Sequence, residues 1–240
     1  MKVELHVHTR FSKDSFLCFW PLYIMCRIKG IEWLAITDHN CLIGALQFAD
    51  FCSKHGSKLH VIPGEEIYTS EVEVIGLYLK QEIPQGLSAK ETIDLIKKQN
   101  SIVYVPHPYD EMRHKTVLFE SAIRENIGLI DCIEVHKGRN ISPHYDEEQK
   151  KIADNYQLAP VIGSDAHTLI EIGRNYLILP ELELDTPENF KMAIRASKFH
   201  TKSCVKFAHC ITKFVKLSKL MLQGDFYEIR RIITRKIKRN

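Results

Sequence analysis

The chain alternates between short runs of β-branched residues and stretches with helical periodicity, and this alternation constrains its fold more than any other feature. Parallel strands need a crossover connection between them, so a strand–helix–strand order is typical of parallel β/α architecture. The pattern therefore predicts an α/β fold, either a barrel or an open sheet. The seven or eight predicted strands are residues 3–7, 33–37, 59–62, 72–77, 102–105, 129–135, 159–162 and 176–179.

Start and stop signals define the helices between these strands. Pro21 stands early in one helix and Gly30 closes it, an arrangement that both residue types favour. Ser88 and Glu91 have the spacing of a capping box, which predicts that another helix begins there. The predicted helices are residues 21–29, 42–54, 88–99, 117–125, 146–156 and 187–197.

Length and composition are ordinary for a soluble globular protein. The chain has 240 residues, 45% of them hydrophobic, which is enough for one α/β barrel. No apolar run reaches the about 18–20 residues of a transmembrane helix, so we expect no transmembrane segment. The start of the chain is charged and β-like, without a signal-peptide core, so we expect a cytoplasmic protein. The seven cysteines include no Cys-x-x-Cys pair, which favours reduced thiols.

The net charge of +3 is unevenly distributed. Residues 200–240 contain eleven Lys or Arg and two acids, giving +9, so residues 1–199 carry −6. We therefore predict an acidic body over residues 1–199 and a basic helical C-terminal extension over residues 200–240. Apolar and basic residues alternate at helical spacing in two segments of the extension, 205–222 and 227–237.

Histidines and carboxylates follow the ends of five predicted strands. Side chains two residues apart in a strand share a face, so His6 and His8 are expected to project together. The active sites of β/α barrels lie at the carboxyl ends of the strands, where all of these residues fall. The five segments are His6-Val7-His8-Thr9, Thr37-Asp38-His39, Gly64-Glu65-Glu66, His107-Pro108 and Gly163-Ser164-Asp165-Ala166-His167.

The types of ligand atom limit which metal ions such a cluster could bind. Imidazoles and carboxylates without thiolates suit Zn²⁺, Mn²⁺ or Fe better than Ca²⁺ or Mg²⁺. The candidates are too many for one ion, so the sequence predicts two or three divalent metal ions. Closely spaced ions suit the hydrolysis of phosphate esters, because they activate water and hold the attacking and leaving oxygens.

The ordered set of motifs resembles the polymerase-and-histidinol-phosphatase (PHP) family over about residues 1–200. The resemblance implies a distorted seven-stranded β/α barrel, a two- or three-metal centre and phosphoester hydrolysis. Many members have a His where this chain has Glu73, which keeps a ligand but adds negative charge. The resemblance implies catalytic roles for Asp165, His167 and His39. The implied metal ligands are His6, His8, Asp14, His39, Glu66, Glu73, His107, Asp165 and His167.

Substrate and partners are less constrained by the sequence. Arg113 and Arg139 follow two of the strands, and a guanidinium fork matches phosphate oxygens, so both are candidates for substrate binding; each could equally be a solvated surface residue. The favoured substrate is a small phosphorylated molecule such as a nucleotide or sugar phosphate. The alternatives are a nuclease that holds DNA or RNA ends with the basic extension, and a non-catalytic metal-binding module.

The extension also has more than one interpretation. We expect its two helices to pack their apolar faces on the barrel, because contiguous exposed apolar patches are uncommon in monomers. Contact with nucleic acid or with an anionic membrane surface is the alternative.

Overall fold

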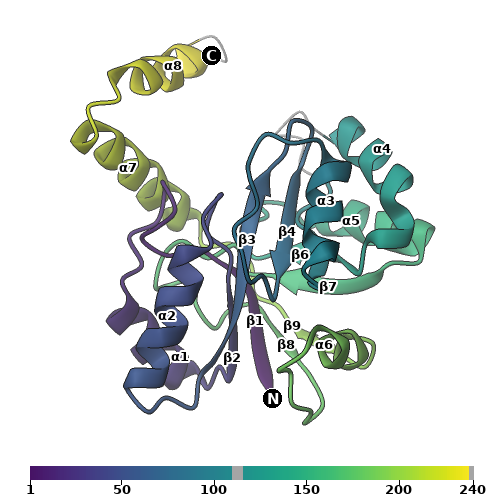
Figure 1. Ribbon diagram of the computed structural model, residues 1–240. Helices are drawn as coiled ribbons and strands as arrows, with labels where there is room; N and C mark the ends of the chain where they lie inside the picture. Colours follow the sequence, from purple (N-terminus) through teal and green to yellow (C-terminus); the bar gives the residue numbers. More distant parts are fainter. Residues whose placement is uncertain (110–115, 238–240) are drawn as a thin grey trace.

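One mixed sheet of nine strands organises the protein (Figure 1). The structure is a computed structural model that describes residues 1–109 and 116–237. The strands lie in the order β7-β6-β5-β4-β3-β2-β1-β8-β9. Their bounds are β1 Lys2–Val7, β2 Trp33–Ile36, β3 His60–Tyr68, β4 Glu73–Leu77, β5 Ile102–Val105, β6 Cys132–Lys137, β7 Ala159–Gly163, β8 Tyr176–Ile178 and β9 Lys198–His200.

The sheet curls into a nearly closed barrel because the segment after β7 returns to β1. The amide of Ser164 donates to the carbonyl of Leu5 (3.0 Å), and the amide of His8 donates to the carbonyl of Ala166 (2.9 Å). These contacts use the carboxyl half of β1, whereas β8 pairs with its amino half at Lys2 and Val3. Strands β1 to β7 therefore form the expected seven-stranded barrel, which closes at the end that carries the candidate ligands.

Strand direction departs from the predicted all-parallel pattern. Strand β4 is antiparallel to both β3 and β5, and β8 and β9 are also antiparallel to their neighbours. A tight turn joins β3 to β4, in which the amide of Thr69 donates to the carbonyl of Val72 (2.9 Å). Such a hairpin can only join antiparallel strands. The sequence analysis also missed β9, a three-residue edge strand.

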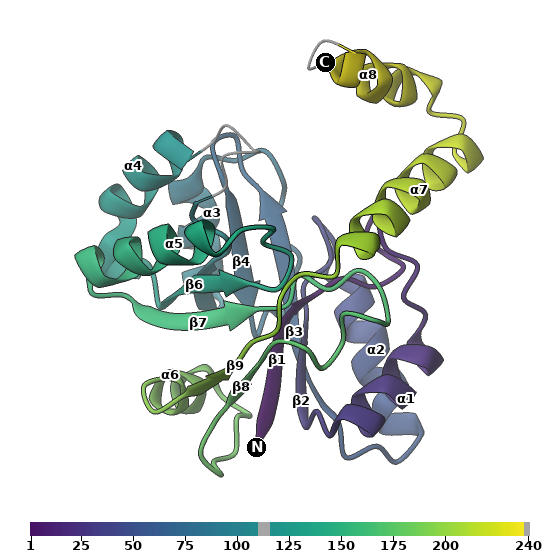
Figure 2. The ribbon, with the colours of Figure 1, turned by 180° about the vertical axis from the view of Figure 1, so that it is seen from behind.

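Helices cover both outer sides of the barrel (Figures 1 and 2). Helices α1 and α2 lie beside β2, and α3, α4 and α5 lie beside the half that contains β4 to β7. The rings of Phe19 and Phe51 lie 5.2 and 6.0 Å from the ring of Phe48, which is fully buried. The helices are α1 Phe19–Lys29, α2 Ile43–Lys54, α3 Ala89–Lys98, α4 Thr116–Asn126, α5 Pro143–Tyr156, α6 Pro187–Ile194, α7 Lys206–Leu222 and α8 Phe226–Ile237, with a 3-10 turn at Ile127–Leu129.

Helices α7 and α8 of the extension project from the ligand-bearing end of the barrel as an arm (Figure 1). One face of α7 buries Ala208 and Val215, but Phe214 on the other face is 71% exposed. The expectation that the apolar faces of both helices pack on the barrel is therefore wrong for Phe214, since α7 carries apolar residues on two sides. Helix α8 follows α7 after a short connection and lies at the far end of the arm, with contacts to α7. Among the described residues, no helix is long and apolar enough to span a membrane.

Two phenylalanines provide a test of this arrangement. We expect Phe48→Ala to lower the free energy of unfolding by about 3–5 kcal/mol, because it opens a cavity in the core. Phe214→Ala is expected to change it by less than about 0.5 kcal/mol, because the ring is mostly in solvent. Urea unfolding of both variants would measure the difference, and a large loss for Phe214→Ala would contradict the exposed position of this face.

Candidate metal centre

Glu66 lies at the middle of a cluster of four imidazoles. One carboxylate oxygen, Oε2, is 2.9 Å from Nδ1 of His39 and 3.4 Å from Nε2 of both His6 and His8. The other oxygen, Oε1, is 3.0 Å from Nε2 of His107. All five side chains are at least nine-tenths buried, so strands β1 and β3 and the segments after β2 and β5 bring their charged groups to one place away from water.

Two aspartates complete the cluster on its other side. Oδ1 of Asp165 lies 3.4 Å from Nε2 of His8 and 3.5 Å from Nδ1 of His167. Oδ1 of Asp14 lies 3.3 Å from Nε2 of His167 and 3.6 Å from Nε2 of His39. The structure thus brings both aspartates and His167, which the sequence analysis marked as candidates, to the same cluster as Glu66.

Glu73 reaches the cluster because β4 runs antiparallel. Its Oε2 is 3.4 Å from Nε2 of His107. Glu73 is the first residue of β4, and the reversed direction places that amino end beside the carboxyl end of β5. Strand β3 is longer than predicted and continues to Tyr68, so Glu66 lies within it. Its neighbour Glu65 points away from the cluster and accepts the amide of Ile83 (3.0 Å), because successive residues of a strand face opposite sides.

Five ligand atoms of the cluster are buried without a hydrogen-bond partner, which is the observation that fits metal ions. A buried polar atom without a partner costs free energy, unless an ion that the cluster is built to hold supplies the interaction. Three groups of side chains place their ligand atoms within 4.8 Å of one another: His8-His39-His167, His6-Glu66-His107 and His6-His8-Asp165. The five atoms are Nε2 of His6, Nε2 of His8, Oδ1 of Asp14, Nδ1 of His39 and Oε2 of Glu66.

Hydrogen bonds behind the cluster fix the orientation of three imidazoles. Nδ1 of His6 donates to Glu134 (3.0 Å), and Nδ1 of His167 donates to the carbonyl of Asp165 (2.8 Å). Nδ1 of His8 lies 3.1 Å from Oγ of Ser12, whose hydroxyl donates to Asp38. In each ring Nε2 faces the cluster, where the neutral imidazole would offer its lone pair, and this is the arrangement of a metal-binding histidine. The sequence analysis missed Glu134 and Ser12 as supporting residues.

The charges of the cluster balance each other. Burial lowers the pKa of the His6 imidazole, but Glu66, Asp165 and Glu134 raise it to about 10 overall. Burial raises the pKa of the Glu66 carboxyl, yet the neighbouring His6 and His39 hold it well below its usual range. Burial and the neighbouring His167 and His39 keep the pKa of His8 well below its ordinary value. Without metal, a protonated His6 therefore offsets part of the negative charge of the buried carboxylates at neutral pH.

Three of the clustered residues have left-handed backbone conformations. The φ angles are +64° at His6, +28° at His107 and +48° at Asp165. Residues other than glycine rarely adopt this backbone region, and such conformations concentrate at functional sites. The conformation of His6 accompanies a register shift in the pairing of β1 with β2. The backbone is thus bent locally to aim these side chains at one place.

The candidate substrate residues do not join the cluster in the same way. Arg113 lies outside the described residues. Arg139 is buried, with Nε 3.4 Å from Glu171 and a hydrogen bond to Oγ1 of Thr212 in α7 (2.9 Å). Its role in substrate binding stays a prediction. The ammonium of Lys137 lies closer to the metal centre, 3.7 Å from Oδ2 of Asp165.

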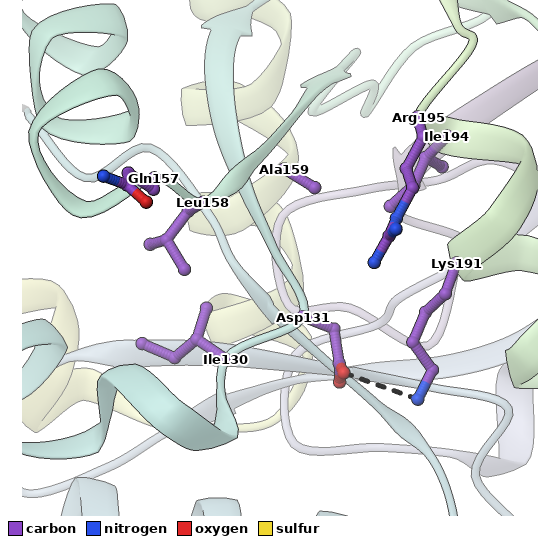
Figure 3. Close-up of a pocket in the computed structure, with 8 residues that line it drawn as sticks. All are labelled: Ile130, Asp131, Gln157, Leu158, Ala159, Lys191, Ile194 and Arg195. Carbon is purple, nitrogen blue, oxygen red and sulfur yellow. Dashed lines mark ion pairs between the residues drawn. The ribbon is translucent and has the colours of Figure 1, made fainter.

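A separate cavity of about 440 Å³ lies at the opposite end of the barrel, where β6 and β7 begin (Figure 3). Asp131 in its wall pairs with Lys191 (3.6 Å) and with Lys97. The cavity contains none of the clustered ligands. Its lining residues are Ile130, Asp131, Gln157, Leu158, Ala159, Lys191, Ile194 and Arg195.

The PHP domain model matches residues 4–175, which include all of the clustered residues. The chain therefore belongs to the PHP domain family. It is also 36% identical over 191 residues to an uncharacterised protein of Methanocaldococcus jannaschii, and the match covers 79% of this chain and 75% of the relative.

Solved structures share the fold at low sequence identity. One is a two-domain protein of Bacteroides vulgatus, named as containing a predicted PHP-like metal-dependent phosphoesterase, with a TM-score of 0.62 and 20% identity. The match covers 84% of this chain but only 64% of that protein. Another is PsfC of Pseudomonas syringae, with a TM-score of 0.62 and 16% identity over 92% of this chain and 98% of PsfC.

The carboxylate behind His6 leads to a prediction. Glu134→Gln keeps the size of the side chain but removes the charge that orients the imidazole, so we expect divalent-metal affinity to fall about 10–100-fold. Glu65→Gln is the matched control, because Glu65 is buried beside Glu66 but faces away from the cluster. Titration with Mn²⁺ would measure both variants. Equal affinities for Glu134→Gln and the parent would refute this role of Glu134.

The raised pKa of His6 leads to a second prediction. Below a pKa of about 10, metal-free His6 is protonated, whereas a metal ligand must be neutral. Metal binding should therefore release at least one proton, and affinity should rise about tenfold for each pH unit between pH ~6 and ~8. Calorimetry in buffers with different ionisation enthalpies would count the protons. Metal affinity that is independent of pH would contradict this assignment.

Proposed function

We propose that the protein is a metal-dependent phosphoesterase that hydrolyses a phosphate ester of a small molecule, such as a nucleotide or sugar phosphate. The observation that carries the proposal is the buried set of unpartnered ligand atoms around Glu66. Membership of the PHP domain family and the fold shared with the phosphoesterase-containing protein of Bacteroides vulgatus support it. The reaction consumes water and releases an alcohol, together with phosphate from a monoester substrate or with a phosphate monoester from a diester substrate.

We propose two or three Mn²⁺, Zn²⁺ or Fe ions at this centre. Three overlapping groups of ligand atoms support more than one position, with His6 and His8 each shared between two groups. Nitrogen and carboxylate donors without thiolates fit these ions. When bound, the ions supply Lewis-acid activation of water and polarisation of the phosphoryl oxygens.

The residues of the chain would divide the remaining work. Asp165, His167 and His39 are the proposed catalytic residues, because they border the cluster on the side where Asp14 leaves it partly open to solvent. Nδ1 of His167 is held by a backbone carbonyl, so Nε2 faces the cluster. Lys137, beside Asp165, is a cation that would attract a phosphate oxygen to the same place.

A nuclease is the second candidate, and the exposed basic arm is the observation that favours it. Arg230 and Arg231 in α8 are exposed, and the extension carries a charge of +9. A polyanion would bind such an arm in a salt-dependent way. Charge reversal at both arginines should weaken hydrolysis of oligonucleotides but leave hydrolysis of a small phosphate ester unchanged. A screen of phosphorylated metabolites and oligonucleotides with Mn²⁺ would separate the two candidates.

Ligand removal tests the proposed activity. We expect Asp165→Asn and His8→Ala to reduce turnover by more than about 100-fold, since each loses a ligand rather than an outer contact. The fold should persist, because both residues follow strands rather than lying inside them. Elemental analysis should find at least two metal equivalents in the parent. Near-normal turnover in either variant would refute its role, and a parent that takes up no metal would favour a non-catalytic module.

A further inference from the structure

Lys219 in α7 binds the loop between β1 and α1 with all three N–H groups of its ammonium. It donates to the backbone carbonyls of Arg10 (2.7 Å), Ser12 (2.6 Å) and Ser15 (2.7 Å). An ammonium has three donors, so each one is used. The candidate ligand Asp14 lies between the second and third acceptors. One side chain of the extension thus holds the loop on both sides of a residue of the metal centre.

The loop depends on this cation for its shape. Three carbonyl dipoles that converge on one point repel each other unless a positive charge or water lies between them. The half-buried Lys219 supplies that charge, and its ammonium also lies 5.0 Å from the ring of Phe16. Loss of the ammonium would let the carbonyls move apart, and the Asp14 backbone would move with them.

On its inner side, the same loop is joined to the ligands. The single hydroxyl hydrogen of Ser15 is shared between two acceptors, the carbonyls of His8 (2.8 Å from Oγ) and His167 (3.0 Å from Oγ). Oδ1 of Asp14 lies 3.3 Å from Nε2 of His167 and has no hydrogen-bond partner. The loop is therefore held between the cluster and α7, with Lys219 as the outer attachment.

Helix α7 has a second attachment to a ligand-bearing segment. The guanidinium of Arg139 donates to Oγ1 of Thr212, seven residues before Lys219 on the same face of the helix. Arg139 also pairs with Glu171, whose other oxygen accepts the amide of His167 (3.0 Å). The face of α7 that contacts the barrel thus links the two segments that carry Asp14 and His167.

We propose that α7 is part of the metal centre and that Lys219 is a positioning residue, which holds the Arg10–Ser15 loop so that Asp14 faces His39 and His167. The proposal rests on the proposed function only in treating Asp14 as a metal ligand. Residues 200–240 then do not form an independent module. Deleting the extension would disturb the centre itself, so it could not separate a nuclease from a small-molecule phosphoesterase.

The test compares two lysines of one helix. Lys219→Met keeps the apolar stem and removes the ammonium, and Lys213→Met makes the same change at an exposed position. Titration of the full chain with Mn²⁺ should show about tenfold weaker binding at one site for Lys219→Met, the lower limit for loss of a supporting contact. Lys213→Met should bind within about twofold of the parent. If Lys219→Met does not fold, Lys219→Gln, which keeps one donor without the charge, should show the same loss in smaller degree.

A double-mutant cycle shows whether the effect passes through Asp14. In an Asp14→Asn background, Lys219→Met should change Mn²⁺ affinity by less than about twofold, since the positioned ligand is already impaired. Equal losses in both backgrounds would overturn the positioning role and leave Lys219 with a purely structural one. Parent-like Mn²⁺ binding by Lys219→Met would overturn the inference but not the proposed function, whereas a parent that binds none of Mn²⁺, Zn²⁺ and Fe²⁺ would overturn both.

Discussion

The burial of one carboxylate among four imidazoles is the interaction on which the rest of the structure depends. Glu66 is within 3.4 Å of a ring nitrogen of each of His6, His8, His39 and His107. Isolated buried charges are very costly, so these groups are tolerable only where they compensate each other or hold ions. The groups come from four parts of the barrel wall, which are β1, β3 and the segments after β2 and β5. The closure of the barrel therefore brings the groups of the centre together, since the segment after β7 that carries Asp165 returns to β1.

The sequence was most informative where local geometry decides the outcome. The family's Gly-x-Glu spacing pointed to Glu66 rather than Glu65, which the structure places on opposite faces of β3, and the predicted strand ends supplied most of the clustered residues. Sequence analysis failed to predict the direction of β4, because a hydrophobic pattern does not show which way a strand runs. The hairpin at Thr69–Val72, which sets this direction, has no glycine or proline to signal a turn. The sequence signal that could have identified Glu134 as a supporting residue is its position within a predicted, largely apolar strand. Its partner His6 is 128 residues away, and no local pattern shows such a contact.

For the extension, the sequence predicted the helices but not their contacts with the barrel. Its helical periodicity and charge were plain in the sequence, and both helices are present. The contacts that matter, from Thr212 and Lys219, are polar and lie on the face that periodicity would assign to solvent. A lysine in a basic helix is most often a solvated charge. Only the three converging carbonyls distinguish Lys219 from its neighbours in the chain, and these carbonyls belong to the backbone of a loop about 200 residues earlier.

The left-handed conformations of His6, His107 and Asp165 also restrict how this barrel can change during evolution. Histidine, aspartate and asparagine tolerate positive φ better than most residues, whereas β-branched residues do not. An exchange such as Asp165→Asn therefore suits the backbone while it removes the chemistry. Replacement by valine or isoleucine, the usual residues of a barrel wall, would require the local backbone to change its conformation. A related protein that no longer binds metal would still have the left-handed backbone at these positions. Family members without activity should therefore keep small polar residues or glycine at these three positions.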